Sequence, residues 1–228
     1  MIYFIRCIAC KEFTYAKNFP LCPDCHHSVN YSSPTFCQQC GSVECKDNCI
    51  NPWLKRSEIL SYHARYLYFA RTQRVIRSWS MNNGYFFNKR VLTDDSQLNK
   101  KLKNLHYSFI ITMPNATRLT WRNPNNPNYL IANWINQKNK KPIFIFEVLK
   151  RKKITFFKKS ANILLVGDVL RRRKNLFYCC DYLKSIGLKK IHVFFLALYP
   201  LEKTFSHNEI MKHLPQTHLT KTNTLPLG

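Results

Sequence analysis

Residues 163–198, ILLVGDVLRRRKNLFYCCDYLKSIGLKKIHVFFLAL, contain the pattern that decides the fold of the main domain. Four apolar residues at 163–166, bounded by polar residues, are typical of a buried strand. The segment at about 175–186 predicts a helix that stops at Gly187, because glycine readily adopts the left-handed conformation after a helix. The run 191–198 is apolar enough to be buried on both faces. Strand, helix and strand in this order indicate a right-handed crossover, a parallel sheet and therefore an α/β domain.

Weaker patterns upstream supply further elements of such a domain. Residues 106–113 form a β-branched and aromatic run that predicts a strand, and residues 141–149 form a second strand candidate. Residues 129–134 resume an apolar pattern that predicts a helix. Between residues 59 and 81 apolar residues recur among basic ones, and residues 66–79 fit a helix with a basic outer face.

Eight of the ten cysteines lie within the first 49 residues, in four close pairs. Two residues between thiols allow both sulfurs to point at one ion, and two such turns complete a four-thiolate site of the structural zinc type. The pairs predict two zinc sites, most simply Cys7, Cys10, Cys22 and Cys25 for the first and Cys37, Cys40, Cys45 and Cys49 for the second. A crossed pairing of the four turns is also compatible with the spacing.

The competing interpretation of these cysteine pairs is a disulfide framework. The first residues, MIYFIRC, show neither a charged leader nor a long apolar stretch. No run in the chain approaches the roughly 18 to 20 apolar residues that a transmembrane helix requires. We therefore expect a cytoplasmic protein with no integral membrane segment, either free or at the inner face of the cytoplasmic membrane. In a reducing cytosol such cysteine pairs hold metal.

The chain is strongly basic, with 36 Lys and Arg against 12 Asp and Glu and a formal net charge of +24. A surplus of this size is typical of proteins that contact nucleic acid, anionic lipid or another polyanion. The alternative is a lysine-rich composition without functional meaning. Such a bias should raise glutamate together with lysine, and glutamate is scarce, so a polyanionic partner is favoured.

The composition divides the chain into three parts. Residues 1–51 are predicted to form a double zinc ribbon, followed by a short linker that contains Pro52. Residues 58–198 are predicted to form the α/β domain, and residues 199–228 a C-terminal extension with little periodicity. The ribbon is too short to build an apolar core, so metal binding is expected to supply much of its folding free energy.

The unit at 163–198 resembles the signature of type I phosphoribosyltransferases. Together with the cysteine-rich start, it is similar to the ComF family, competence-associated proteins that join a zinc ribbon to such a domain. The family pattern is a hydrophobic strand, two acidic residues, an apolar residue and a Thr-Thr-Gly-x-Thr loop that opens a helix. The resemblance covers about residues 1–198. It implies a small double zinc ribbon followed by a type I phosphoribosyltransferase-like parallel-sheet domain.

Several positions depart from the family pattern at the residues that bind the ribose and the 5′-phosphate in the family. The paired carboxylates of the family hold the ribose hydroxyls, and the loop wraps the 5′-phosphate with N–H groups and hydroxyls. Here Gly167 stands at the first acidic position, and only Asp168 remains. The expected loop is replaced by Arg171, Arg172, Arg173, Lys174 and Asn175, and an arginine in place of glycine obstructs the close approach of a phosphate. We therefore expect a degenerate site with Asp168 as its remnant.

The resemblance implies a role in natural transformation, in which a catalytically inactive protein binds incoming single-stranded DNA. Our hypothesis is that the former sugar-phosphate pocket presents Arg171, Arg172, Arg173 and Lys174 to nucleic-acid phosphates. The alternative for this loop is plain decay of an active site. Two other functions compete: a phosphoribosyltransferase that uses phosphoribosyl pyrophosphate and Mg through Asp168, and a zinc-ribbon module that docks a DNA uptake or recombination protein.

Overall fold

The predicted crossover unit is present in a computed structural model of the chain. Strands β6 (Asn162–Leu170) and β7 (Lys190–Leu198) pair in parallel and are joined by helix α7 (Arg173–Ser185). Gly187 ends the helix with φ at 92°: its N–H donates to the Lys184 carbonyl (3.0 Å), and the N–H of Leu188 donates to the Leu183 carbonyl (2.9 Å). These two bonds are a Schellman motif, which confirms the predicted glycine stop.

The structure describes residues 4–7, 9–15, 21–25, 37, 39, 56–68, 70–81, 96–114, 126–152, 161–170 and 173–198. Within them, five parallel strands form one sheet in the order β3-β7-β6-β4-β5. The three strands not yet introduced are β3 (Ile59–Leu67), β4 (Phe109–Thr112) and β5 (Ile143–Ile145). The predicted α/β class with a parallel sheet is confirmed.

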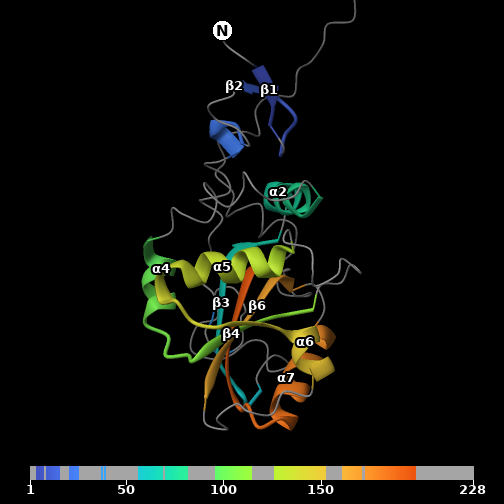
Figure 1. Ribbon diagram of the computed structural model, residues 1–228. Coiled ribbons are helices and arrows are strands. Elements are labelled where there is room, and N and C mark those ends of the chain that lie inside the picture. Colours follow the sequence, from blue (N-terminus) through green and yellow to red (C-terminus); the bar gives the residue numbers. More distant parts are fainter. Residues whose placement is uncertain are drawn as a thin grey trace, which may run out of the picture.

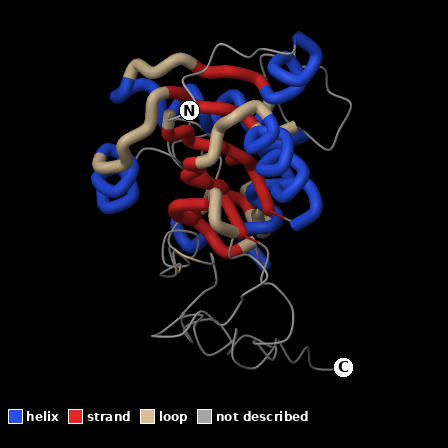
Figure 2. Tube along the Cα trace, turned by 90° about the horizontal axis from the view of Figure 1, so that it is seen from below, coloured by secondary structure: helices blue, strands red, loops and turns tan. Residues whose placement is uncertain are grey.

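Helices cover both faces of this sheet, which gives three layers (Figures 1 and 2). Helices α4 (Ser96–Lys103) and α5 (Pro127–Asn139) lie on one face, and α6 (Phe146–Lys152) and α7 lie on the other. Successive side chains of the strands alternate between the two cores, so that Leu164 packs toward α5 and Leu165 toward α7. The continuous apolar runs found in the sequence are therefore strands buried on both sides.

The apolar core on the α5 face extends to the N-terminal part of the chain. Val75 and Ile76 of helix α2 (Ala70–Met81) belong to it, as do Cys7, Leu21 and Cys25. The N-terminal part also holds the short antiparallel strands β1 (Phe4–Arg6) and β2 (Phe13–Tyr15), drawn above α2 in Figure 1. No helix in the described ranges is long and apolar enough to cross a membrane.

Two of the predicted elements differ in the structure. Residues 59–67 form the edge strand β3 and the helix begins only at Ala70, whereas we predicted a helix from residue 66. Residues 146–149, predicted to continue the strand that begins at residue 141, form the first part of α6. In both places tertiary contacts decide: β3 pairs with β7 along its length, and Phe146 and Leu149, three positions apart, are buried together against α7.

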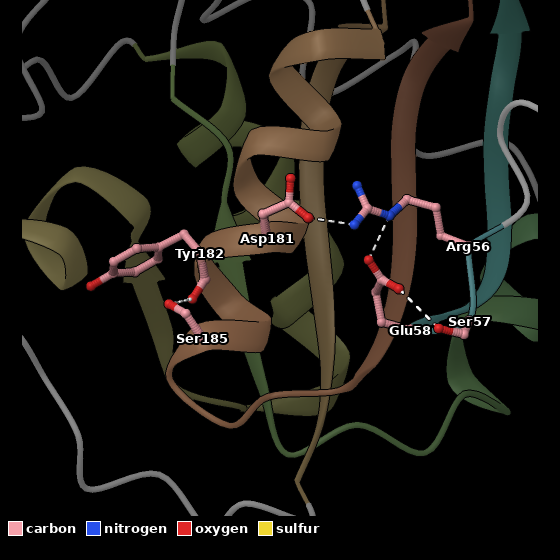
Figure 3. Close-up of polar contacts among 6 residues, drawn as sticks. All are labelled: Arg56, Ser57, Glu58, Asp181, Tyr182 and Ser185. Atoms are coloured by element: carbon pink, nitrogen blue, oxygen red, sulfur yellow. Dashed lines mark hydrogen bonds and ion pairs between the residues drawn. The ribbon is translucent and has the colours of Figure 1, made fainter.

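An ion-pair cluster links the start of the edge strand β3 to helix α7 (Figure 3). Arg56, just before β3, pairs with Glu58 (Nε–Oε1 2.5 Å) and with Asp181 of α7. Its guanidinium lies over the Phe177 ring, 5.0 Å from the centroid. Glu58 is only 4% exposed, so Arg56 supplies the countercharge that a buried carboxylate needs. The cluster thus ties the start of β3, just before the register shift between Ile59 and Ser61, to α7.

A second buried polar group lies on β3 and β7. The Ser61 hydroxyl contacts His63 Nε2 (2.8 Å) and His192 Nδ1 (2.7 Å), so one hydroxyl bridges two imidazoles. Burial lowers the pKa of His63 from 6.5 to about 4, with smaller contributions from Lys101 and from repulsion by His192 when that ring is also protonated. Burial likewise lowers the pKa of His192. Both rings are therefore neutral in the folded protein at neutral pH.

The lowered pKa of His63 predicts a loss of stability in mild acid. Between pH 6.5 and 4 the unfolded chain binds a proton at this ring that the folded chain does not, so the free energy of unfolding falls as pH falls. Protonation of His63 can lower the free energy of unfolding by about 3 kcal/mol at most. In His63→Gln, which retains a hydrogen-bonding group for Ser61, unfolding by urea at pH 7 and pH 4 should differ less than in the wild type. If His63→Gln and the wild type showed the same pH dependence, the assignment would be contradicted.

Candidate functional site

The first predicted set of cysteines is assembled in the structure. The Sγ atoms of Cys7, Cys10, Cys22 and Cys25 all lie within 4.8 Å of one another, and those of Cys10 and Cys22 are 3.7 Å apart. A tetrahedral zinc with Zn–S bonds of about 2.3 Å places its sulfurs about 3.8 Å apart. The donor set and its spacing therefore fit a tetrahedral metal ion, and these four cysteines are positioned to bind one.

The first pair of ligands is held by a tight turn between β1 and β2. The Cys7 N–H donates to the Glu12 carbonyl (2.8 Å), and the Lys11 N–H donates back to the Cys7 carbonyl (2.9 Å). Closing this turn forces Lys11 to a φ of 70°, in the left-handed region that costs a residue with a Cβ about 1–2 kcal/mol. The turn therefore stores strain directly beside the metal ligands.

Backbone amides also point at the sulfurs. The Cys22 N–H donates to Cys7 Sγ (3.3 Å), and the Cys25 N–H donates to Cys22 Sγ (3.4 Å). Burial opposes ionisation of Cys7, but N–H groups of Cys10, Cys22 and Ala9 outweigh it and lower its pKa to about 7. Burial raises the pKa of Cys22 and of Cys25, and the nearby Cys7 charge adds to this effect. One thiolate forms readily, whereas four require a divalent cation among them.

The second predicted metal site falls mostly outside the described residues. Cys40, Cys45 and Cys49 lie there, and Cys37 is half-buried against the core on the α7 face. Cys179 and Cys180, which have no ligand spacing, are completely buried in that same core, as expected of packing residues.

The remnant of the predicted sugar-phosphate site lies at the carboxyl end of β6. Asp168 is half-buried, and its carboxylate accepts the N–H of Val169 (2.7 Å). The strand continues to Leu170 and α7 already begins at Arg173, so only residues 171 and 172 separate them. Lys174 and Asn175 are thus in the first turn of the helix, and a five-residue phosphate loop is not formed at this position.

Packing explains the glycine at position 167. A Cβ on Gly167 would lie 2.6 Å and 2.8 Å from two ring atoms of Phe195 and 3.1 Å from the Met113 sulfur. Phe195 is only 1% exposed and is enclosed by the core on the α7 face, so its ring has little room to move. The volume that an acidic side chain would need is therefore filled by Phe195 and Met113.

The predicted cationic residues are only partly described. Arg171 and Arg172 lie outside the described residues, Arg173 is placed by its backbone as the first residue of α7, and Lys174 is exposed. The described surface as a whole is strongly basic, with three exposed acidic residues, Glu12, Asp24 and Asp181, against fifteen exposed cations. These are Arg6, Lys11, Arg74, Arg77, Lys100, Lys101, Lys103, Lys140, Lys141, Lys150, Arg151, Lys174, Lys184, Lys189 and Lys190.

Sequence reasoning missed a buried cation on the edge strand. Arg65 is 4% exposed, and among the described residues its Nε and Nη1 atoms have no hydrogen-bond partner; its guanidinium lies over the Tyr66 ring at 5.0 Å. Thr112 Oγ1 and Asn128 Oδ1, at the carboxyl end of β4 and the start of α5, are also buried with no hydrogen-bond partner in the described part of the chain. The alternation of polar and apolar residues through Ser61, His63 and Arg65 was the signal that could have revealed this strand.

No protein-family model matches this chain, and no curated protein matches it either. The site is therefore interpreted from its own geometry. The parallel α/β domain and the four-cysteine cluster agree with the architecture that the sequence resemblance implied.

The strained turn predicts that Lys11→Gly strengthens the metal centre. Relief of about 1–2 kcal/mol of strain exceeds the extra backbone entropy of glycine, about 0.5–1 kcal/mol, so the N-terminal unit should gain up to about 1 kcal/mol. Metal release to a competing chelator should be slower than in the wild type. Glu12→Gly, one residue on and without a positive φ, should release metal at least as fast as the wild type. If Lys11→Gly released metal faster than the wild type, Lys11 would not be strained in this turn.

The close contact at Gly167 predicts that Gly167→Ala destabilises the domain by about 1–3 kcal/mol through overpacking. Phe195→Leu alone should also destabilise it, because a buried ring is lost. The double variant should lose less free energy of unfolding than the sum of the two changes, measured by urea denaturation. Strict additivity would show that Phe195 does not exclude a side chain at position 167.

Proposed function

We propose that this chain is a ComF-like competence protein that binds single-stranded DNA during natural transformation, without catalysing phosphoribosyl transfer. The observation that carries the proposal is the excess of exposed cations over exposed acids on the described surface, fifteen against three. Such a surface attracts polyanions, and the affinity of a phosphate backbone for it arises from release of condensed counterions. The competence role and the DNA partner are supported by the sequence resemblance.

The metal is proposed to be zinc, in a structural role. Four cysteine ligands favour zinc over the hard cations that prefer oxygen, and the 3.7 Å sulfur separation suits a tetrahedral ion. With no protein ligand exchanged for water, such a site has no open position for chemistry. Its function would be to fold the N-terminal unit, and the eight-cysteine pattern extends the proposal to a second zinc at Cys37, Cys40, Cys45 and Cys49.

The packing at the carboxyl ends of the parallel strands supports the absence of phosphoribosyl transfer. Phe195 and Met113 occupy the space for one ribose-binding carboxylate, and helix α7 begins where a phosphate loop would lie. Asp168 is left as a single carboxylate there. A phosphoribosyltransferase that depends on Asp168 and Mg is the competing function, and binding of phosphoribosyl pyrophosphate distinguishes it.

The proposal predicts non-specific binding of single-stranded DNA that weakens steeply with salt. A fluorescent oligonucleotide is titrated at several salt concentrations with wild type and with Arg171→Ala/Arg172→Ala/Arg173→Ala. Each phosphate contact contributes about 0.7 to the slope of log affinity against log salt, so the variant should lose about 2. The matched control is Lys184→Ala/Lys189→Ala/Lys190→Ala. It removes three exposed charges near the amino end of β7, at the opposite end of the parallel strands, and should change the slope less.

Two outcomes would overturn parts of this proposal. Equal slopes in the two triple variants would remove the basic segment at residues 171–174 from the interface. Absence of any DNA binding by the wild type, together with magnesium-dependent binding of phosphoribosyl pyrophosphate in calorimetry, would favour the enzyme.

A further inference from the structure

An aromatic surface lies on the hairpin that carries the first metal ligands. Phe13 and Tyr15 on β2 are 66% and 48% exposed, while Thr14 between them is 5% exposed. Because side chains alternate along a strand, the two rings lie on the same outer face of the hairpin. Arg6 on β1 stands opposite Phe13 in the register. We call the three residues Arg6, Phe13 and Tyr15 the hairpin platform.

Exposure of this kind is rare elsewhere in the protein. Among the described residues, four large apolar or aromatic side chains are strongly exposed, and two of them are the neighbours on this three-residue strand. The other two are Leu60 and Tyr178, on separate elements. A solvent-exposed aromatic pair is not needed for the core of so small a unit, whose buried residues are Cys7, Ala9, Leu21 and Cys25. Both rings therefore present aromatic surface to the solvent, where a ligand could contact it.

The platform combines flat rings with positive charge. The Arg6 guanidinium lies over the Phe13 ring, 5.0 Å from its centroid, and Lys11 is exposed at the turn of the same hairpin. Aromatic faces that stack bases, beside cations that follow the backbone, are the combination by which proteins bind single strands without sequence preference. Sheet-borne aromatics stack two or three bases in the same manner in RNA-binding domains. A duplex offers no free base faces to such a surface.

We propose that the hairpin platform stacks the bases of a single-stranded nucleic acid, with Arg6 and Lys11 beside the phosphates. The inference rests on the proposed function and adds where, and by which chemistry, the strand is held. The net charge of +24 identifies a polyanion as the occupant, and the paired rings identify one with exposed bases. Cys7 follows β1 directly and Cys10 lies in the turn before β2, so a metal ion bound by these cysteines would also hold the platform in shape.

The test compares two oligonucleotides of equal length, one with normal bases and one with abasic sites along its centre. Wild type should bind the normal strand more tightly, because only that strand can stack. Phe13→Ala/Tyr15→Ala should lose about tenfold or more in affinity for the normal strand and nothing for the abasic strand. Its salt slope should stay that of the wild type, since stacking releases no counterions.

Three controls make the outcome specific. Tyr178→Ala removes an equally exposed ring from α7, 45% exposed, and should bind like the wild type. Phe13→Trp/Tyr15→Trp should restore the preference for the normal strand. Metal content, measured on each purified variant, should be unchanged, because neither ring is a ligand.

The failures of the two proposals are distinguishable. If wild type binds single strands but Phe13→Ala/Tyr15→Ala binds both oligonucleotides as the wild type does, the platform is wrong and the proposed function stands. If the double variant weakens both oligonucleotides equally, the rings do not stack bases and the inference also fails. If wild type binds neither oligonucleotide, the proposed function itself is wrong.

Discussion

The pairing of β6 with β7 is the interaction on which the rest of this structure depends. The two strands run parallel from Asn162 opposite Lys190 to Leu170 opposite Leu198, and both of their faces are covered by helices. Parallel pairing requires a crossover, and α7 supplies it while burying Leu176, Cys179 and Leu183 against the sheet. The remaining strands add to this pair: β4 to the free edge of β6, and β3 to the free edge of β7. The Arg56 cluster then fixes β3 to α7.

The same packing that makes the centre of the sheet stable limits its chemistry. Phe195 and Met113 fill the α7 face beneath Gly167, so a carboxylate cannot enter there without displacing a buried ring. The continuation of β6 to Leu170 and the early start of α7 remove the length that a phosphate loop needs. At this carboxyl end of the sheet Asp168 is a half-buried carboxylate, and the described surface around the domain is strongly cationic.

The N-terminal unit follows a different physical rule. Its three-residue strands and few buried side chains cannot offset the entropy of ordering the chain, so its fold would depend on a metal ion held by the four cysteines. Because the unit has so small a core, the side chains of Phe13 and Tyr15 lie on its surface. Exposed rings on the hairpin of the cysteine site and a broad cationic surface are complementary properties for the proposed ligand, since the first would contact bases and the second would contact phosphates.

By itself the sequence determined the β6-α7-β7 unit, the glycine stop at Gly187 and the close cysteine pairs, because each follows from local spacing and conformational preference, although it left open which two pairs share one metal site. It also determined the charge. Only the tertiary structure decided that residues 59–67 form a strand, since an edge strand beside β7 overrides a mixed local pattern. Likewise, only packing across strands revealed why position 167 is glycine, and only the hairpin register placed Arg6 beside Phe13. Contacts between residues distant in the chain have no local signature, which is the physical reason for this division.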